Sequence, residues 1–376
     1  MLKHTPLYDQ HVALNAKLMN VAGWELPLEY SSQIAEHLAV RESAGMFDIS
    51  HLRPVDVTGP GARDFLRRLL ATDVARIDTV GAALYACMLN THGGVVDDMI
   101  VYHLAQDWYR LVPNALTGEK DQAWIQSQAR DFDVEVVERE DLALIAVQGP
   151  SACAQVAAVL DDTLADAMNT LDRFMATSDG ETVIGRTGFT GEDGLELMLA
   201  SGKAVSVWKA LLDGGMTAAG FGARNTLRLE AGLNRYGYDM DEDTSPAECN
   251  LGALVDLDDD DRHFVGREAV LMEAEQGVRH RLIGLLLEDD GVMRDKAAVR
   301  EPARDDGRLD VSAGDAQGRV TTGSYSPILG ASIALARVPA AWADQAQLEV
   351  HIHDAWQSAR VVVPPFVRLG ESCIEG

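Results

Sequence analysis

Residues 93–102, Gly-Gly-Val-Val-Asp-Asp-Met-Ile-Val-Tyr, constrain the fold more than any other segment. A glycine pair typical of a turn leads into an apolar run that predicts a β-strand. Asp97 and Asp98 interrupt this run, although strand interiors disfavour aspartate and a buried charge is costly without a partner. Adjacent strand residues point to opposite faces, so one carboxylate is expected to point inward, toward a cation or a protonatable nitrogen, and the other to cap or face solvent. The alternative is a pair of turn carboxylates at a hairpin.

The charge balance narrows the classes of partner. The chain has 376 residues and a formal charge of −27, from 59 acidic and 32 basic side chains. This length suggests two or three domains, and the 47% hydrophobic content is enough for folded cores. Such an acidic surface repels nucleic acid and anionic membranes, so neither is expected as a partner. It would also suit a saline cytoplasm.

The cysteines and the N-terminal residues indicate the compartment. Four cysteines lie far apart, at Cys87, Cys153, Cys249 and Cys373, and none forms a C-x-x-C pair. This pattern argues against a zinc ribbon or a disulfide framework and fits a reducing compartment. There is no long apolar N-terminal segment and no apolar run of membrane-spanning length, so we expect a soluble, cytoplasmic protein. His351 and His353 share a strand face without a third ligand, and we expect no metal.

Two parts of the chain differ in the secondary structure that their apolar residues predict. Residues 50–140 predict a compact α+β unit, whose strands are expected at 84–89, 95–104, 108–112 and 134–137. From residue 282 onward, short alternating segments predict a separate all-β domain. The polar segment 289–318, rich in Gly and Asp, predicts surface loops between strands.

A predicted helix at 223–231 places Arg224 and Arg228 four residues apart on one face. Such a pair is commonly a pair of solvent-exposed partners for Asp or Glu. An anion clamp or an internal ion pair is the other interpretation. The preceding glycine-rich run at 185–197 lacks the G-K-[ST] of a phosphate loop, so a nucleotide site is not expected there.

Several motifs, taken together and in order, resemble the aminomethyltransferase, or T-protein, of the glycine cleavage system. Besides the segment 93–102, these motifs are Thr5-Pro6-Leu7-Tyr8, Ala22-Gly23-Trp24-Glu25-Leu26-Pro27, Gly45-Met46-Phe47-Asp48-Ile49-Ser50-His51, Gln148-Gly149-Pro150, Thr187-Gly188-Phe189-Thr190-Gly191-Glu192-Asp193-Gly194, Leu227-Arg228-Leu229-Glu230-Ala231-Gly232 and Tyr325-Ser326-Pro327-Ile328-Leu329-Gly330. They span nearly the whole chain.

The resemblance implies an α+β fold of three lobes, arranged as a cloverleaf around a central folate pocket. It implies a discontinuous first lobe at 1–52 and 141–245, and a ferredoxin-like second lobe at 53–140 and 246–278. The C-terminal lobe, at 279–376, is expected to be a β-barrel or jelly roll. The implied reaction transfers the methylene carbon of the aminomethyl group on lipoylated H-protein to tetrahydrofolate, which gives 5,10-methylenetetrahydrofolate and ammonia.

The resemblance also implies site residues. Asp98 matches the family's key acid, which orients and electrostatically supports the folate nitrogens as positive charge develops, with proton transfer as a further role. Glu196 matches the carboxylate that holds the aminopyrimidine edge of the pterin, and Arg224 matches a folate-contacting arginine. Three further residues fall at positions associated with the folate site, namely Tyr85, Tyr102 and Asn114.

The sequence departs from the family pattern at Leu52, Phe189, Asn225 and Ala253, which puts the pocket shape in question. These departures motivate an alternative function, another tetrahydrofolate-dependent one-carbon transferase or demethylase on the same scaffold. A non-catalytic folate-binding accessory protein is a third hypothesis. It ranks lowest because the K-G-C-Y-x-G-Q type of signature is absent and the Asp-Asp pair is present.

Overall fold

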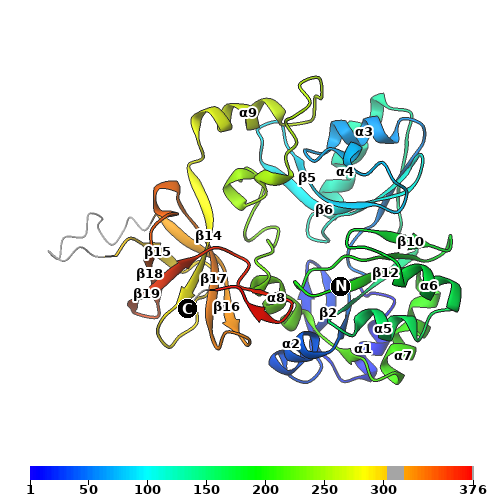
Figure 1. Cartoon of the computed structure of the whole chain (residues 1–376), viewed down its shortest axis with the longest axis horizontal. Coiled ribbons are helices and arrows are strands. Elements are labelled where there is room, and N and C mark those ends of the chain that lie inside the picture. The colour runs from blue at the N-terminus through cyan, green and yellow to red at the C-terminus, as the bar shows by residue number, and fades with distance from the viewer. Residues whose placement is uncertain (303–316, 375–376) are drawn as a thin grey trace.

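Three β-sheets build three lobes in the computed structural model, which describes residues 1–302 and 317–374 (Figure 1). One sheet has six strands, one has five, and the third closes into a six-stranded barrel. Two short hairpins accompany them: β1 (Lys17–Val21) with β2 (Trp24–Glu29), and β20 (Val367–Arg368) with β21 (Glu371–Ser372). The predicted α+β fold of three lobes is confirmed. The lobe boundaries at 52, 140, 245 and 278 stay predictions.

The sheet of the first lobe takes strands from both sides of the second lobe in sequence. In spatial order its strands are β10 (Ala176–Ser178), β11 (Val183–Gly185), β12 (Gly194–Ala200), β9 (Leu142–Gln148), β3 (Gly45–Asp48) and β13 (Thr217–Ala218). Every residue of β9 is buried. Helices cover both faces of the sheet, which explains why β9 is a nearly continuous apolar run.

The helices of this lobe divide between two cores. A core of Trp208, Met168 and Val156 packs one face of the sheet, and a second core around Phe47 and Leu227 packs the other. The helices are α1 (Tyr8–Ala13), α2 (Gln33–Glu42), α5 (Ala152–Ala157), α6 (Asp162–Asn169), α7 (Ser201–Asp213) and α8 (Phe221–Glu230). Ser32 caps α2, because its side chain accepts a hydrogen bond from the Ala35 N–H.

The second lobe is a five-stranded antiparallel sheet with helices on one face. Its strands, in spatial order, are β5 (Ala83–Leu89), β6 (Val95–Ala105), β7 (Trp108–Val112), β4 (Val55–Thr58) and β8 (Glu135–Glu138). Helices α3 (Ala62–Leu69) and α4 (Gly118–Gln128) contribute Phe65, Leu66 and Ile125 to the core that they share with the sheet. The predicted strands of this unit are therefore confirmed, with shifts of about a residue at their ends.

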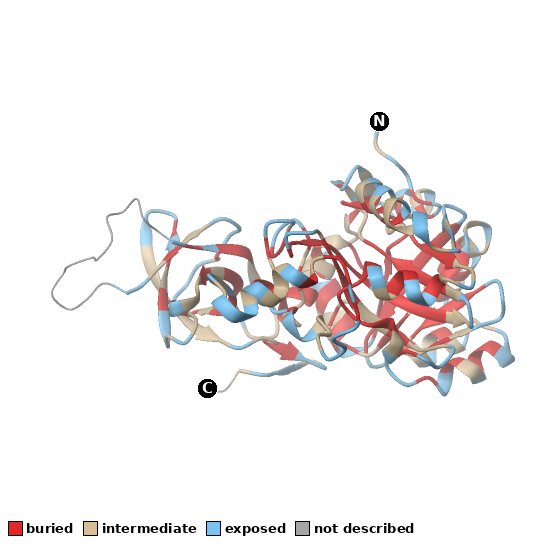
Figure 2. Cartoon of the chain, turned by 90° about the horizontal axis from the view of Figure 1, so that it is seen from above, coloured by how far each residue is buried: buried red, intermediate tan, exposed pale blue. Residues whose placement is uncertain are grey.

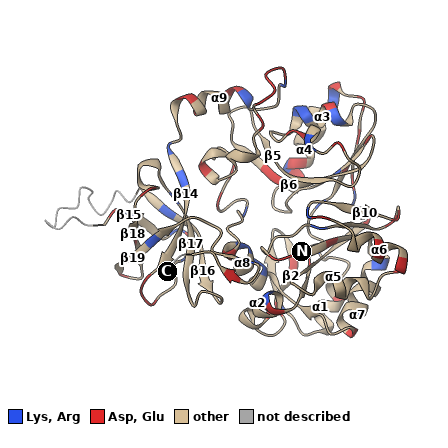
Figure 3. Cartoon of the chain, viewed as in Figure 1, with Lys and Arg blue, Asp and Glu red and all other residues tan. Residues whose placement is uncertain are grey.

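Alternation along β6 separates two environments. Met99 and Val101 belong to the core beneath the helices, whereas Asp98 and Ile100 line a cavity on the opposite face, to which Met99 also contributes. Acidic residues colour part of the β6 ribbon red in Figure 3, which also shows charged residues on outer helices such as α3 and α9 (Arg267–Gln276).

The C-terminal lobe is a closed barrel around its own apolar core (Figure 2). Its strands, in spatial order, are β14 (His280–Leu287), β17 (Ala331–Pro339), β16 (Gly318–Ser326), β15 (Ala298–Arg300), β18 (Gln347–Ile352) and β19 (Ala355–Val362). The prediction of loops throughout 289–318 is wrong at β15, a strand too short to show alternation, which pairs with both β16 and β18. Residues 303–316 of that predicted loop lie outside the described residues.

Buried charged groups of α8 join the barrel to the first lobe. Glu230 is fully buried and contacts the His37 ring nitrogen at 3.0 Å and the Arg41 guanidinium at 2.8 Å, both from α2. Its other oxygen accepts from the Ser326 hydroxyl of β16 at 2.5 Å. One carboxylate therefore connects two helices of the first lobe with the barrel.

We expect Glu230→Ala to lower the free energy of unfolding by about 3–5 kcal/mol, because it leaves Arg41 and His37 buried without this partner. Urea denaturation of the full chain measures the change. The exposed Glu275 of α9 provides the control, since Glu275→Ala should stay within about 0.5 kcal/mol of the parent. Equal stability of the two variants would contradict the connecting role of Glu230.

Candidate active site

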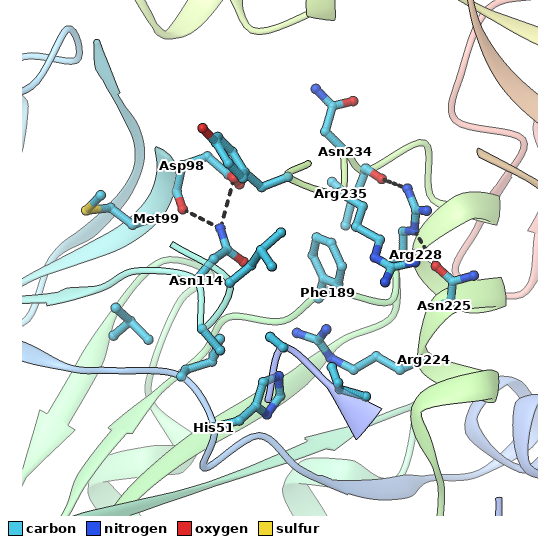
Figure 4. A pocket seen from close by; sticks show the side chains of 18 of the residues that line it. His51, Asp98, Met99, Asn114, Phe189, Arg224, Asn225, Arg228, Asn234 and Arg235 are labelled. Carbon is cyan, nitrogen blue, oxygen red and sulfur yellow. Dashed lines mark hydrogen bonds between the residues drawn. The ribbon is translucent and has the colours of Figure 1, made fainter. Parts of the chain in front are cut away.

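A cavity of about 380 Å³ opens between the first and second lobes (Figure 4). Its lining residues come from the β1–β2 hairpin, from β5, β6, β12 and α8, and from the segments that follow β7 and α8. In the described part of the chain all of them fall between Met19 and Tyr238, so the barrel contributes none. The cavity therefore depends on how the two α+β lobes meet.

Asp98 lies in this cavity with only 8% of its surface exposed. The Tyr85 hydroxyl donates to Oδ2 at 2.6 Å, and the Asn114 side-chain amide donates to Oδ1 at 3.0 Å. Burial raises the pKa of Asp98 to about 7, and the nearby charge of Asp97 acts in the same direction. The two donors oppose this rise because they stabilise the ionised form. The carboxyl can thus change its ionisation near neutral pH.

Asn114, two residues beyond β7, holds both carboxylates of the Asp-Asp pair. Its backbone N–H donates to Asp97 Oδ2 and its Nδ2 donates to Asp97 Oδ1, each at 2.9 Å. The same Nδ2 reaches Asp98, as the dashed lines in Figure 4 show. Asp97 and Asp98 do point to opposite sides of β6. The expectation that one of them caps or faces solvent is wrong, because Asp97 is fully buried.

Glu196 of β12 lines the cavity as well. Its Oε2 accepts from the Thr187 hydroxyl at 2.6 Å and from the Tyr102 hydroxyl at 3.4 Å. Within residues 1–302 and 317–374, no hydrogen bond reaches Oε1, which leaves an acceptor for a ligand. Tyr102 is fully buried behind Glu196 and does not line the cavity, so it supports the carboxylate and cannot flank a bound ring.

The two arginines of α8 have different surroundings. Arg228 is buried and forms an internal ion pair with Asp239 at 2.7 Å, which decides between the two interpretations of that side chain. Arg224 lines the cavity and stacks over the Phe189 ring, 4.6 Å from its centroid. Burial lowers the pKa of Arg224 to about 10. No carboxylate of the described residues forms an ion pair with Arg224, so this cation is available to a ligand.

Three of the departures from the family pattern, Leu52, Phe189 and Asn225, line the cavity, whereas Ala253 is exposed elsewhere. Phe189 supplies a ring face to Arg224 and has no hydroxyl to offer a ligand. Asn225 accepts from the Arg228 guanidinium at 3.1 Å, which places the Asn225 side chain in the internal network of α8.

His51 is a cavity residue to which the sequence assigned no role. It is buried, and its Nδ1 has no hydrogen-bond partner among the described residues. Burial lowers the pKa of His51 to about 4, and the charge of Arg224 adds to this effect, so the imidazole is neutral near pH 7.

Arg235 is a second residue near the cavity to which the sequence assigned no role. It stacks 3.8 Å from the Tyr238 ring centroid at the same cavity. For neither His51 nor Arg235 does the spacing along the sequence indicate a place at the cavity.

The described residues contain no group of three His, Cys, Asp or Glu side chains suited to a metal. They also contain no helix of the length and apolarity that a membrane span requires. The cavity instead combines a buried acid with pKa near neutrality, a second carboxylate with a free acceptor, and an unpaired guanidinium. These features define an α+β enzyme that acts on a small molecule with both hydrogen-bond donors and acceptors.

The chain matches known domain families and known proteins over nearly its whole length. Residues 7–259 match the GCVT N-terminal domain, and residues 280–368 match the glycine cleavage T-protein C-terminal barrel domain. The chain is 46% identical over 374 residues to the aminomethyltransferase of Pseudomonas syringae pv. tomato, with full coverage of both chains. It is 47% identical over 372 residues to that of Alcanivorax borkumensis, with 99% coverage of each. The chain therefore belongs to the aminomethyltransferase family, the T-proteins of glycine cleavage, and is a transferase.

A solved structure agrees with this assignment. The glycine cleavage system aminomethyltransferase T from Bartonella henselae superposes with a TM-score of 0.90 at 32% sequence identity. The match covers 98% of this chain and 99% of that one, so the arrangement of all three lobes is shared.

We expect Arg224→Gln to raise the pKa of His51, because the substitution removes a buried positive charge beside the imidazole. In NMR titrations between about pH 4.5 and 8, the His51 ring resonances should be nearly constant in the parent and should titrate in the variant. Arg130→Gln, at an exposed position, should leave them unchanged. Identical His51 titrations in Arg224→Gln and the parent would contradict the electrostatic contact.

Proposed function

We propose that this chain transfers the methylene carbon of the aminomethyl group on a lipoylated H-protein to tetrahydrofolate, forming 5,10-methylenetetrahydrofolate and releasing ammonia and the dihydrolipoyl H-protein. The proposal rests on the buried carboxyl of Asp98. Tyr85 and Asn114 hold this carboxyl inside a cavity that also contains Glu196 and Arg224. We further propose that the reaction takes place in the cytoplasm.

The cavity residues fit tetrahydrofolate. A volume of about 380 Å³ lies within the range of small-molecule sites. Glu196 Oε1 can accept from the adjacent N–H donors of an aminopyrimidine edge, while Thr187 and Tyr102 hold the other oxygen in place. Tyr85, Ile100 and Phe189 supply apolar surface against which flat rings can pack. Bound folate supplies the nucleophilic nitrogens that accept the carbon.

Asp98 provides the electrostatic support for the transfer. The ionised carboxylate stabilises positive charge on the reacting nitrogens, and the low polarity of its surroundings strengthens this interaction. Because its pKa is about 7, the same group can also accept a proton near neutral pH. Tyr85 and Asn114 fix the carboxylate before the substrates bind, so little reorganisation is needed.

The test is a reconstituted assay with tetrahydrofolate and aminomethylated H-protein, following ammonia and methylenetetrahydrofolate. We expect turnover well above the uncatalysed rate. A parallel assay supplies small N-methyl or S-methyl donors in place of H-protein. Turnover with those donors alone would support the alternative one-carbon transferase or demethylase, and folate binding without turnover on any donor would support the accessory protein.

Asp98→Asn should lower kcat by about 10²-fold or more, because the variant loses the negative charge and keeps the shape of the side chain. The dissociation constant for tetrahydrofolate should change much less, since Glu196 and Arg224 are retained. The exposed Asp107→Asn is the matched control and should have parental kinetics. Unchanged turnover in Asp98→Asn would remove Asp98 from the mechanism.

The pH dependence of turnover follows from the raised pKa of Asp98. A carboxyl with pKa about 7 is protonated below that pH, so kcat should rise as the pH increases through about 7. This acidic limb should be absent from the residual activity of Asp98→Asn. A limb near pH 4, or the same limb in parent and variant, would show that another group titrates.

A further inference from the structure

A second acidic side chain lies beneath the Asp-Asp strand, on the side away from the cavity. Asp121, in the first turn of α4, is fully buried and does not line the cavity. It contacts Asp97, which β6 directs toward the helix-covered face of the sheet. Two carboxyl groups are thus buried against each other behind the site.

The surroundings of Asp121 compensate its charge only in part, because burial outweighs the effects of Thr117 and Lys120 and leaves its pKa raised. Neither of its oxygens accepts a regular hydrogen bond from an N–H or O–H donor of the described residues. The neighbouring Thr117 hydroxyl donates to the Asn114 carbonyl at 3.3 Å, and its proximity lowers the pKa of Asp121 without cancelling the effect of burial. The Lys120 ammonium is directed elsewhere, to the Tyr236 hydroxyl at 3.1 Å and to Glu242 at 2.6 Å.

Two buried carboxylates in contact repel each other unless a proton lies between them. Burial, together with the charge of Asp121, raises the pKa of Asp97 well above its ordinary range. Burial also raises the pKa of Asp121 to about 6. Both shifts favour a pair that keeps one proton at neutral pH and carries a single negative charge.

Asp97 connects this pair to the cavity through one residue. Both of its oxygens accept from Asn114, one from the backbone N–H and one from the side-chain amide. The same amide nitrogen donates to Asp98. The orientation of Asp97 therefore fixes the donor that orients Asp98.

We propose that Asp121 is a positioning residue, which shares one proton with Asp97 and thereby fixes Asn114 and, through Asn114, the carboxyl of Asp98. The catalytic consequence rests on the function proposed above, whereas the shared proton does not. The other titratable groups near the pair are Asp98, Lys120 and, from the segment after α8, Tyr236, which itself lies near Asp241 and Glu242. Lys120 and Glu242 pair with each other, so neither replaces the shared proton.

Infrared difference spectroscopy of the full chain at pH 8.5 tests the shared proton directly. At this pH Asp98 and ordinary carboxyls are ionised, so the C=O stretching band of a protonated carboxyl should come from the pair. Asp97→Asn should abolish the band. Asp121→Asn should abolish it too, because the neutral amide no longer penalises an ionised Asp97 and can donate to it. The exposed Glu119→Gln of α4 is the control and should keep the band. No band in the parent, or an unchanged band in Asp121→Asn, would overturn the proposal.

Kinetics test the positioning. Asp121→Asn preserves a donor to Asp97 and the single negative charge, so kcat should stay within a few-fold of the parent. Asp121→Val removes the contact, and kcat should fall by about 10²-fold with little change in the folate dissociation constant. Parental kcat in Asp121→Val, or equal losses in both variants, would overturn the positioning role. If the parent is inactive with H-protein and folate, the proposed function fails while the infrared result still decides the shared proton.

Discussion

The hydrogen bonds from Tyr85 and Asn114 to the buried carboxyl of Asp98 are the interaction around which the site is built. Burial raises the pKa of this carboxyl, and the two donors lower it because they stabilise the ionised form. Tyr85 comes from β5, and Asn114 comes from the segment directly after β7; these strands are the two neighbours of β6. The antiparallel pairing of three strands therefore sets both the position of the acid and the balance that brings its pKa to about 7.

Helix α8 provides the complementary side of the cavity and the link to the barrel. Arg228 and Glu230 are compensated by Asp239, Arg41 and Ser326, and these contacts hold the helix in place. Arg224, one turn earlier, faces the cavity and stacks on Phe189 without an ion-pair partner among the described residues. Both arginines belong to the same helical face and line the cavity, so the difference between them lies in their partners: Asp239 pairs with Arg228, and no carboxylate of the described residues pairs with Arg224.

Local patterns predicted much of the fold and part of the site. The apolar run interrupted at Asp97 and Asp98 predicted β6, and alternation predicted that the two carboxylates point apart. The family resemblance assigned Asp98, Glu196, Arg224, Tyr85 and Asn114 to one site, and the structure gathers them at one cavity.

The contact of Asp97 with Asp121 could not be predicted, because it depends on how α4 packs on the sheet. The resemblance assigned Tyr102 to the folate site, because the sequence does not show how β12 packs. In the structure this packing places Tyr102 behind Glu196. The three-residue strand β15 is recognisable only through its barrel partners.

The proposed role of Asp98 requires a carboxyl that titrates near neutral pH and lies against the bound folate. Carbon-13 NMR of the chain labelled at the aspartate carboxyl carbon, with Asp98→Asn to assign the resonance, measures this titration with and without tetrahydrofolate. We expect an Asp98 resonance that titrates near pH 7 in the free protein and shifts when folate binds. An Asp98 resonance that titrates near pH 4 and does not respond to folate would contradict this role.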